Sequence, residues 1–177
     1  IPGMNDGAYR NVYDDVMGKY GTRKALVVDT RFNGGGDLVS DLAAFLTGKA
    51  YMENATDTYT ESFEPTFRWL KPSIALANEA NYSDGHCFTF MYQNLNIGKL
   101  VGMPTPGTCT YAGWEALPDN SIRWGVPPLG VKSMDGKYLE NAQSEPDIKI
   151  MNEYHTVNKG IDQQLETAIS ELLKQIK

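Results

Sequence analysis

Residues 24–36, KALVVDTRFNGGG, decide the expected fold, since they join a short apolar run to a turn with three consecutive glycines. The run Lys24–Asp29 is β-branched at its centre, which is typical of a strand buried in a parallel sheet. Beyond the turn Asn33–Gly36, apolar residues in Leu38–Thr47 recur at helical spacing, and Asp37 stands where a capping residue is expected. This stretch therefore predicts a strand, a glycine-rich turn and a helix in succession.

The same order recurs further along the chain. Residues Pro72–Asn78 form a second apolar run, which a short turn, Glu79–Tyr82, connects to a helical segment from Ser83 to about Asn96. Gly98–Gly102 is a third short apolar run. Strands that alternate with helices indicate an α/β fold built on a parallel sheet.

Apolar periodicity predicts a helix at each end of the chain. The first covers residues 7–19 with Asp6 as its N-cap, and the second is an amphipathic helix over residues 161–176. Residues 48–70 have no clear period and are interpreted as a long excursion on the substrate side. Between residues 103 and 150 we expect loops with hairpin edges over 103–120 and short strands at 121–126, 130–132 and 146–150.

Length and composition bound the function. The 177 residues fit one domain, 1–177, and the start at Ile1 suggests a piece of a larger protein whose upstream segment is missing. The net charge of −6 argues against nucleic-acid binding, and no apolar run is long enough to cross a membrane. The compartment stays open, with an exported or periplasmic location favoured over a cytoplasmic one.

Cysteine and histidine are scarce. Cys87 and Cys109 leave a single disulfide as an open alternative, and together with His86 and His155 they have no zinc-site spacing. We therefore expect no zinc site.

Two strand ends carry the residues that could do chemistry. The carboxyl ends of parallel strands share one edge of a sheet, so the turn at Asn33–Gly36 and the turn before Ser83 should meet. A glycine-rich turn can direct backbone N–H groups at an anion, and a serine at the start of a helix lies beside its positive end. The alternative is an ordinary turn and an ordinary N-cap. The pattern of a phosphate-binding loop is absent.

Five segments occur together in an order that resembles the tricorn protease and C-terminal-processing peptidase family. The resemblance covers residues 8–177 and implies serine peptidases with a crotonase/ClpP-like fold of repeated strand-strand-helix units. The segments are VVDTRFNGGG (27–36), ALANEANYSDGHCFTF (75–90), GKLVGMPTPGT (98–108), YLENAQSEPDI (138–148) and GIDQQLETAISELLKQI (160–176).

This resemblance implies a role for four residues. Ser83 is the expected nucleophile, and the backbone N–H groups of Asp84 and Gly36 are the expected oxyanion donors, with Gly35 as the alternative to Gly36. Glu140, in the Glu140-Asn141 pair, is expected to support the catalytic machinery through hydrogen bonding and charge.

The general base is missing from this pattern. In the C-terminal-processing branch a lysine follows a T-x-G element, but here Thr105-Pro106-Gly107 is followed by Thr108. The tricorn branch uses a histidine instead. His86 fits a packing role and His155 a surface position, so we expect the base upstream of Ile1 and the chain alone to be inactive.

The resemblance implies peptides or unfolded proteins as substrates, upstream domains of the same protein as partners, and a homo-oligomer as an open alternative. It implies neither a metal nor an organic cofactor. A catalytically inactive peptide-binding or assembly module is the second hypothesis, and an acyl-CoA enzyme of crotonase type is the third. Arg31 is expected to form a structural ion pair with Asp29 or with another carboxylate near the end of the sheet. Trp114, Trp124 and the aromatic residues of Tyr51–Trp69 are expected to have packing roles, with a substrate pocket as the alternative.

Overall fold

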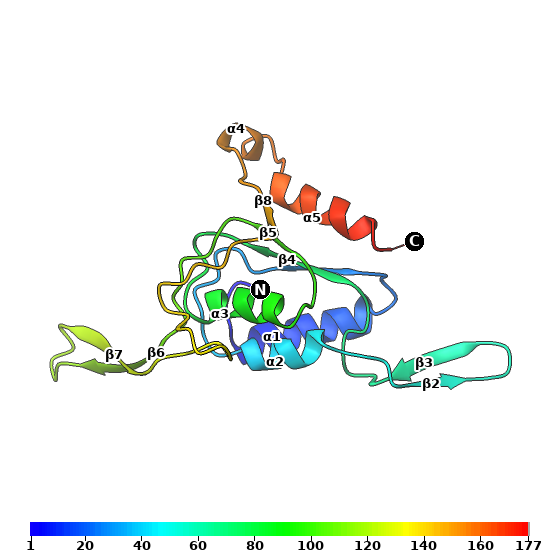
Figure 1. Ribbon diagram of the computed structural model, residues 1–177, viewed down its shortest axis with the longest axis horizontal. Helices are drawn as coiled ribbons and strands as arrows, with labels where there is room; N and C mark the ends of the chain where they lie inside the picture. The colour runs from blue at the N-terminus through cyan, green and yellow to red at the C-terminus, as the bar shows by residue number, and fades with distance from the viewer. Residues whose placement is uncertain (177) are drawn as a thin grey trace.

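A four-stranded parallel sheet organises the computed structural model, which describes residues 1–176 (Figure 1). Its strands lie in the order β1 (Leu26–Asp29), β4 (Ser73–Ala77), β5 (Leu100–Gly102) and β8 (Ile148–Lys149). Every residue of β4 is buried, as the continuous apolar run predicts for a central parallel strand. The α/β class expected from the sequence is confirmed.

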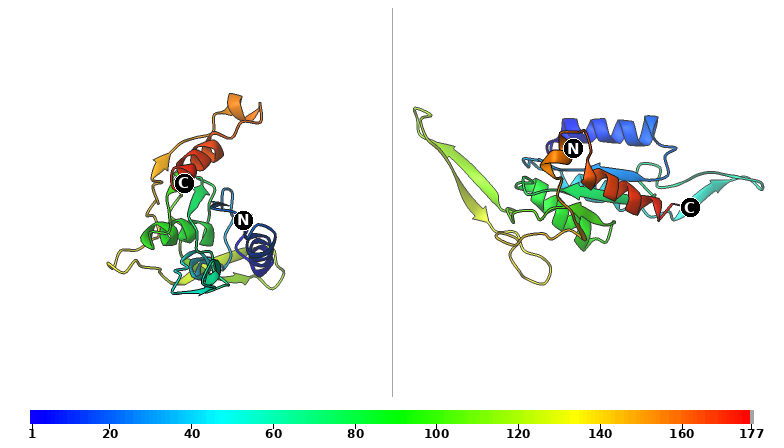
Figure 2. Two further views of the ribbon diagram at one scale, coloured as in Figure 1. Left: turned by 90° about the vertical axis from the view of Figure 1, so that its right-hand side faces the viewer. Right: turned by 90° about the horizontal axis from the view of Figure 1, so that it is seen from above.

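Helices cover both faces of this sheet (Figure 2). One face holds α1 (Asp6–Tyr13), α2 (Val39–Leu46) and α3 (Asp84–Asn94), and the other holds α5 (Gln163–Leu173). Alternate side chains of β4 serve the two faces. Ala75 and Ala77 belong to the core under α2 and α3, whereas Ile74 and Leu76 pack with Ala168 and Leu172 of α5. The expected amphipathic C-terminal helix is thereby confirmed.

The first helix differs from the prediction in two ways. Asn5, not Asp6, is its N-cap, because the Asn5 side-chain oxygen accepts the Ala8 N–H at 3.0 Å. The helix also changes to a π-helix, η1, over Asp14–Lys19. The predicted span of 7–19 is therefore helical but of two kinds.

Two hairpins extend from opposite ends of the body (Figure 1). Residues 48–70, expected as an irregular excursion, contain β2 (Met52–Ala55) paired with β3 (Thr60–Glu64). The second hairpin pairs β6 (Tyr111–Ala116) with β7 (Arg123–Leu129). Every residue of β2, β6 and β7 is exposed.

These hairpins place most of the aromatic residues that were expected to have packing roles at the surface instead. Trp114 and Trp124 on the second hairpin are 60% and 37% exposed, and Tyr51 and Phe63 on the first are also exposed. Only Trp69, beyond the first hairpin, is buried. Of the predicted short strands, 121–126 shifts to β7, 146–150 shrinks to β8, and 130–132 contributes a single bridge between Lys132 and Tyr138.

The short helix α4 (Tyr154–Val157) precedes α5, and the Asp162 carboxylate caps α5 by accepting the Leu165 N–H at 3.0 Å. No helix within residues 1–176 has the length and apolar character needed to cross a membrane.

Candidate active site

Ser83 occupies a sharp bend between β4 and α3. Its backbone has φ 52° and ψ −123°, a conformation that costs free energy for any residue with a side chain. Ser83 is the N-cap residue of α3, yet its hydroxyl makes no capping hydrogen bond. The alternative that Ser83 is an ordinary N-cap is therefore not supported. Strained strand-to-helix turns of this kind hold the nucleophilic serine of α/β-hydrolases.

Asn81 fixes the bend from within. Its side-chain amide donates to the Thr30 carbonyl at 2.9 Å and to the Gly85 carbonyl at 3.2 Å, while its side-chain oxygen accepts the Asn78 N–H at 2.9 Å. Asn81 is fully buried. These contacts join the ends of β1 and β4 to the start of α3 and hold Ser83 in its strained conformation.

The glycine-rich turn lies directly against Ser83, as the sequence predicts. The Tyr82 N–H donates to the Asn33 carbonyl at 2.8 Å, and the Asn33 side chain accepts the Gly35 N–H at 2.8 Å. Gly35 has φ 98°, and a Cβ placed on it would lie only 2.7 Å from the Ser83 Cβ. Glycine at this position therefore permits the close approach of the two strand ends.

Gly36 is held from its other side by the N-terminal segment. Gly36 has φ 142°, and a Cβ there would lie 1.8 Å from the Met4 carbonyl oxygen. Met4 donates to the Gly35 carbonyl at 3.0 Å and accepts the Asp37 N–H at 2.9 Å. The turn is thus fixed on both sides.

Gly36, Ser83 and Asp84 line the same small cavity, of about 10 Å³, together with Cys87, Cys109, Thr110 and Tyr111. The backbone N–H groups of Gly36 and Asp84 donate to no protein acceptor within residues 1–176. Two N–H groups without a protein acceptor at one cavity are available to a ligand oxygen. A space of this size accepts about one water-sized group.

The Asp84 side chain has the helix-capping role that the sequence predicts for Asp37. Its carboxylate accepts the Leu38 N–H at 2.7 Å and the Val39 N–H at 3.2 Å, so it caps α2. The prediction that Asp37 caps this helix is wrong, because Asp37 is exposed and the N-cap residue, Leu38, has no side-chain cap. Burial raises the pKa of the Asp84 carboxyl, against the two N–H donors that lower it.

Thr108 stands where a lysine would follow the T-x-G element. The Ser83 N–H donates to the Thr108 hydroxyl at 3.0 Å, so this residue holds the backbone of Ser83. Next to it, Cys109 forms a disulfide with Cys87 of α3, with the two Cα atoms 5.3 Å apart. The alternative left open by the sequence is thereby settled, and the cross-link ties the segment around Thr108 to the first turn of α3.

Neither histidine side chain makes a hydrogen bond to the Ser83 side chain in the described part of the chain, although the His86 backbone N–H donates to the Ser83 carbonyl at 2.9 Å. His86 is 1% exposed, and its Nδ1 is 2.6 Å from the Thr105 hydroxyl. Burial lowers the pKa of His86, which matches the expected packing role. His155 is on the surface beside Glu153 at 3.1 Å, also as expected.

Glu140 is exposed and lies in a turn that is fixed when the Asn141 N–H donates to the Gly107 carbonyl at 2.7 Å. Its charge raises the pKa of His86, which burial lowers more strongly. Glu140 makes no hydrogen bond to Ser83 within residues 1–176. Its turn nevertheless packs on the same loop that carries Thr108, because a Cβ on Gly107 would lie 2.6 Å from the Ala142 nitrogen.

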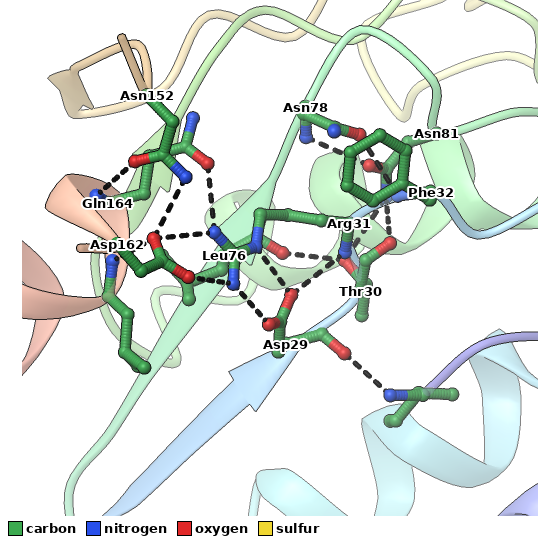
Figure 3. A network of polar contacts seen from close by, with 12 residues as sticks. Asp29, Thr30, Arg31, Phe32, Leu76, Asn78, Asn81, Asn152, Asp162 and Gln164 are labelled. Atoms are coloured by element: carbon green, nitrogen blue, oxygen red, sulfur yellow. Dashed lines mark hydrogen bonds and ion pairs between the residues drawn. The ribbon is translucent and has the colours of Figure 1, made fainter. Parts of the chain in front are cut away.

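An ion-pair network lies at the end of β1 (Figure 3). Arg31 contacts Asp29 at 2.6 Å, as the sequence predicts, and also Asp162 at 2.7 Å and Gln164 at 3.1 Å. Figure 3 shows the Arg31 guanidinium between the carboxylates of Asp29 and Asp162. The network is structural, and it joins the strand that leads into the glycine-rich turn to α5.

A parallel α/β sheet, a serine in a strained bend and a glycine-rich turn against it define the serine hydrolase class. The comparison with protein families narrows this class, since the model of peptidase family S41 matches residues 1–150. The chain belongs to peptidase family S41, a family of serine peptidases.

Individual relatives point to one branch of that family. The tricorn protease of Thermoplasma acidophilum is 30% identical over 156 residues, which are 87% of this chain and 14% of that protein. A putative tricorn-like protease C-terminal subunit of Sulfurisphaera tokodaii is 29% identical over 179 residues, which are 100% of this chain and 21% of that protein. The chain therefore spans only a small part of the relatives that it matches.

Solved structures agree with the fold. The crystal structure of the tricorn protease superposes with a TM-score of 0.86 at 28% identity, covering 98% of this chain and 17% of that one. The photosystem II D1 C-terminal processing protease gives a TM-score of 0.59 at 16% identity, over 85% of this chain and 41% of that one, and shares the fold alone. The expected resemblance and fold family are thus confirmed.

Several features of the site could not be read from the sequence. The Thr108 contact, the capping of α2 by Asp84 and the disulfide all join residues at least 22 positions apart. One local feature of the sequence pointed to such contacts. The turn after β4 contains two asparagines, Asn78 and Asn81, and a buried asparagine side chain needs several hydrogen-bond partners.

Proposed function

We propose that this chain is the nucleophile-bearing part of a serine peptidase that hydrolyses peptide bonds by acyl transfer. The observation that carries the proposal is the shared cavity, where Ser83 meets the unpaired N–H groups of Gly36 and Asp84. Two N–H donors at the reacting serine are what a tetrahedral oxyanion needs, and one such donor typically contributes about 10²–10³ in rate.

The reaction then follows from the positions of these groups. A base takes the Ser83 hydroxyl proton while Oγ forms a bond to the scissile carbonyl carbon, and the carbonyl oxygen becomes an oxyanion between the Gly36 and Asp84 N–H groups. The tetrahedral intermediate collapses as the amine leaves with the proton from the base. Water then attacks the acyl-enzyme by the same path and restores Ser83.

The base comes from outside residues 1–176, because neither the His86 nor the His155 side chain makes a hydrogen bond to the Ser83 side chain. A histidine from an upstream segment fits this role, and Glu140 supports the machinery through its position beside the Thr108 loop. The substrates in this proposal are peptides or unfolded proteins.

The test uses the full-length protein that carries this sequence and a fluorophosphonate probe, which labels activated serines. We expect labelling of the wild-type protein and none of Ser83→Ala, with Ser170→Ala on the exposed face of α5 as a matched control that labels normally. Equal labelling of the wild type and Ser83→Ala would overturn the assignment of Ser83.

Within the described residues, no histidine side chain is hydrogen-bonded to the Ser83 side chain, and this favours one competing function, an inactive peptide-binding module. That function predicts peptide binding by calorimetry but no probe labelling and no peptide turnover by the full-length protein. Slow turnover that disappears in Ser83→Ala would exclude it.

A further inference from the structure

The Asp84 carboxylate connects two parts of the site that are distant in sequence. A single oxygen, Oδ2, accepts the N–H groups of both Leu38 and Val39, 46 and 45 positions away. The residue is 4% exposed, so these hydrogen bonds form out of contact with bulk water, where they restrict geometry more strongly.

Helix capping alone does not require this arrangement. A serine or aspartate at the N-cap position satisfies the first N–H groups of a helix from within the same element. Here Leu38 holds the N-cap position without a side-chain cap, Asp37 before it is exposed, and the carboxylate comes from α3. The carboxylate therefore fixes the position of α2 relative to α3.

The connection closes a short ring around the cavity. Gly36, one expected oxyanion donor, lies two residues before Leu38, whose N–H is bound by the Asp84 side chain. Asp84 itself carries the second donor. Both donors line the cavity with Ser83, so the separation between their N–H groups depends on the hydrogen bonds of the Asp84 carboxylate.

We propose that the Asp84 side chain is a positioning residue, which sets the Gly36 N–H at the distance from the Asp84 N–H that a tetrahedral oxyanion requires. This inference rests on the proposed peptidase function. An oxyanion hole depends on donors within about 2.7–3.1 Å of the oxyanion, so a small displacement of one donor weakens binding of the transition state.

A carboxylate near an oxyanion would ordinarily oppose it by charge repulsion. The position of Asp84 reduces this cost, because its charge lies at the N-terminus of α2 and is shared by two N–H groups. The positioning depends on an oxygen that accepts these two hydrogen bonds. We therefore expect an uncharged oxygen acceptor of the same shape to hold the Gly36 N–H in place as well.

The test compares Asp84→Asn, which retains a side-chain oxygen, with Asp84→Ala, which removes it. Both variants retain the backbone N–H. In the full-length protein we expect Asp84→Ala to reduce fluorophosphonate acylation of Ser83 by about 100-fold, the scale of one lost donor, and Asp84→Asn to retain activity within about tenfold of the wild type. Asp84→Ser, with a shorter oxygen acceptor, should lie between them and provides a second variant if Asp84→Ala does not fold.

A second readout separates positioning from a general structural defect. A peptide boronic acid forms a tetrahedral adduct with Ser83, whereas the corresponding peptide amide binds in its ground state. We expect Asp84→Ala to weaken the boronic acid by a factor similar to its loss of acylation and to leave the amide within about threefold. In turnover, kcat should fall while KM changes little.

Ser73→Ala is the matched control. Ser73 is buried and its hydroxyl lies 2.8 Å from that of Tyr92, near the other end of α3, so its loss destabilises the same helix away from the cavity. We expect a lower Tm for Ser73→Ala with unchanged acylation.

The outcomes distinguish the two proposals. Wild-type protein that is not labelled at Ser83 overturns the proposed function. If the wild type is labelled, the positioning role is overturned by any of three results: Asp84→Ala acylates like the wild type, Asp84→Asn is as slow as Asp84→Ala, or the boronic acid and the amide lose affinity equally.

Discussion

The cavity around Ser83 and the two hairpins are built by opposite means. The cavity is fixed by hydrogen bonds between residues far apart in sequence, such as Asn81 to Thr30 and Asp84 to Leu38. The hairpins are held by pairing between adjacent strands, and their strands are almost entirely exposed. Two-stranded hairpins alone are marginally stable, so rigidity is concentrated where acyl transfer would need it.

The largest expected effect tests the close approach of Gly35 to Ser83. Gly35→Ala places a Cβ at φ 98° and 2.7 Å from the Ser83 Cβ, so we expect a loss of about 2–4 kcal/mol in the free energy of unfolding and at least a 100-fold loss of Ser83 labelling.

The neighbouring Gly34 provides the control for this experiment. A Cβ on Gly34 meets nothing within 4 Å, so Gly34→Ala should label like the wild type. Denaturant titration and probe labelling measure both variants. If both glycine variants behave alike, the close approach of the turn to Ser83 is wrong.

Removing one asparagine from each region sharpens the comparison. Asn81→Ala removes buried hydrogen bonds and leaves their partners without one, so we expect a loss of about 2–4 kcal/mol in the free energy of unfolding. Asn54→Ala on the first hairpin loses only an exposed bond to Ser62, so the change should stay within about 0.5 kcal/mol. Chemical denaturation tests this, and similar losses for the two variants would contradict the contrast.

The disulfide connects the rigid region to the second hairpin. Replacing Cys87 and Cys109 by serine removes a cross-link between residues 22 positions apart, which lowers the free energy of unfolding by about 3 kcal/mol. The measurement is a thermal melt with and without a reductant. The wild type should lose stability on reduction while the double variant does not respond, and a wild type that is insensitive to reduction would refute this prediction.

The smallest effect concerns the ion pairs at the end of β1. Arg31 holds the pKa of the Asp162 carboxyl well below its ordinary value. A carboxyl with a lowered pKa in the folded state contributes stability above its unfolded pKa, near 3.9, and loses that contribution as the pH falls further. Asp162→Asn should therefore reduce stability slightly at pH 7 and flatten its decline between about pH 4 and pH 2. Urea titrations at several pH values measure this, and parallel pH profiles would show that the pair is not coupled to folding.

The sequence predicts the elements whose burial follows a regular pattern. The parallel strands β1, β4 and β5 are visible as apolar runs, and α5 is visible from its apolar periodicity. The first hairpin was missed, and the second was expected only as hairpin edges within 103–120 and a short strand at 121–126. The reason is that β2, β6 and β7 have no buried face, so burial leaves no alternating pattern in them.

Some features of the site could be predicted from the sequence and others could not. Ser83, Asp84 and Gly36 were placed from the ordered motifs, and the structure brings them to one cavity. The capping of α2 by Asp84 instead of Asp37, and the contact of Thr108 with Ser83, depend on tertiary proximity. A local rule for helix capping favours the nearest acidic residue and cannot detect a carboxylate from another helix.

The Arg31 network has a consequence for the C-terminal end of the protein. Asp162 caps α5 and pairs with Arg31, which lies two residues before Asn33 of the glycine-rich turn. No residue of α5 lines the Ser83 cavity, yet displacing α5 would leave the Arg31 guanidinium with one carboxylate fewer at the foot of that turn. Proteolytic removal of α5 would thus act on the glycine-rich turn beside Ser83 indirectly, through the loss of the ion pair between Arg31 and Asp162.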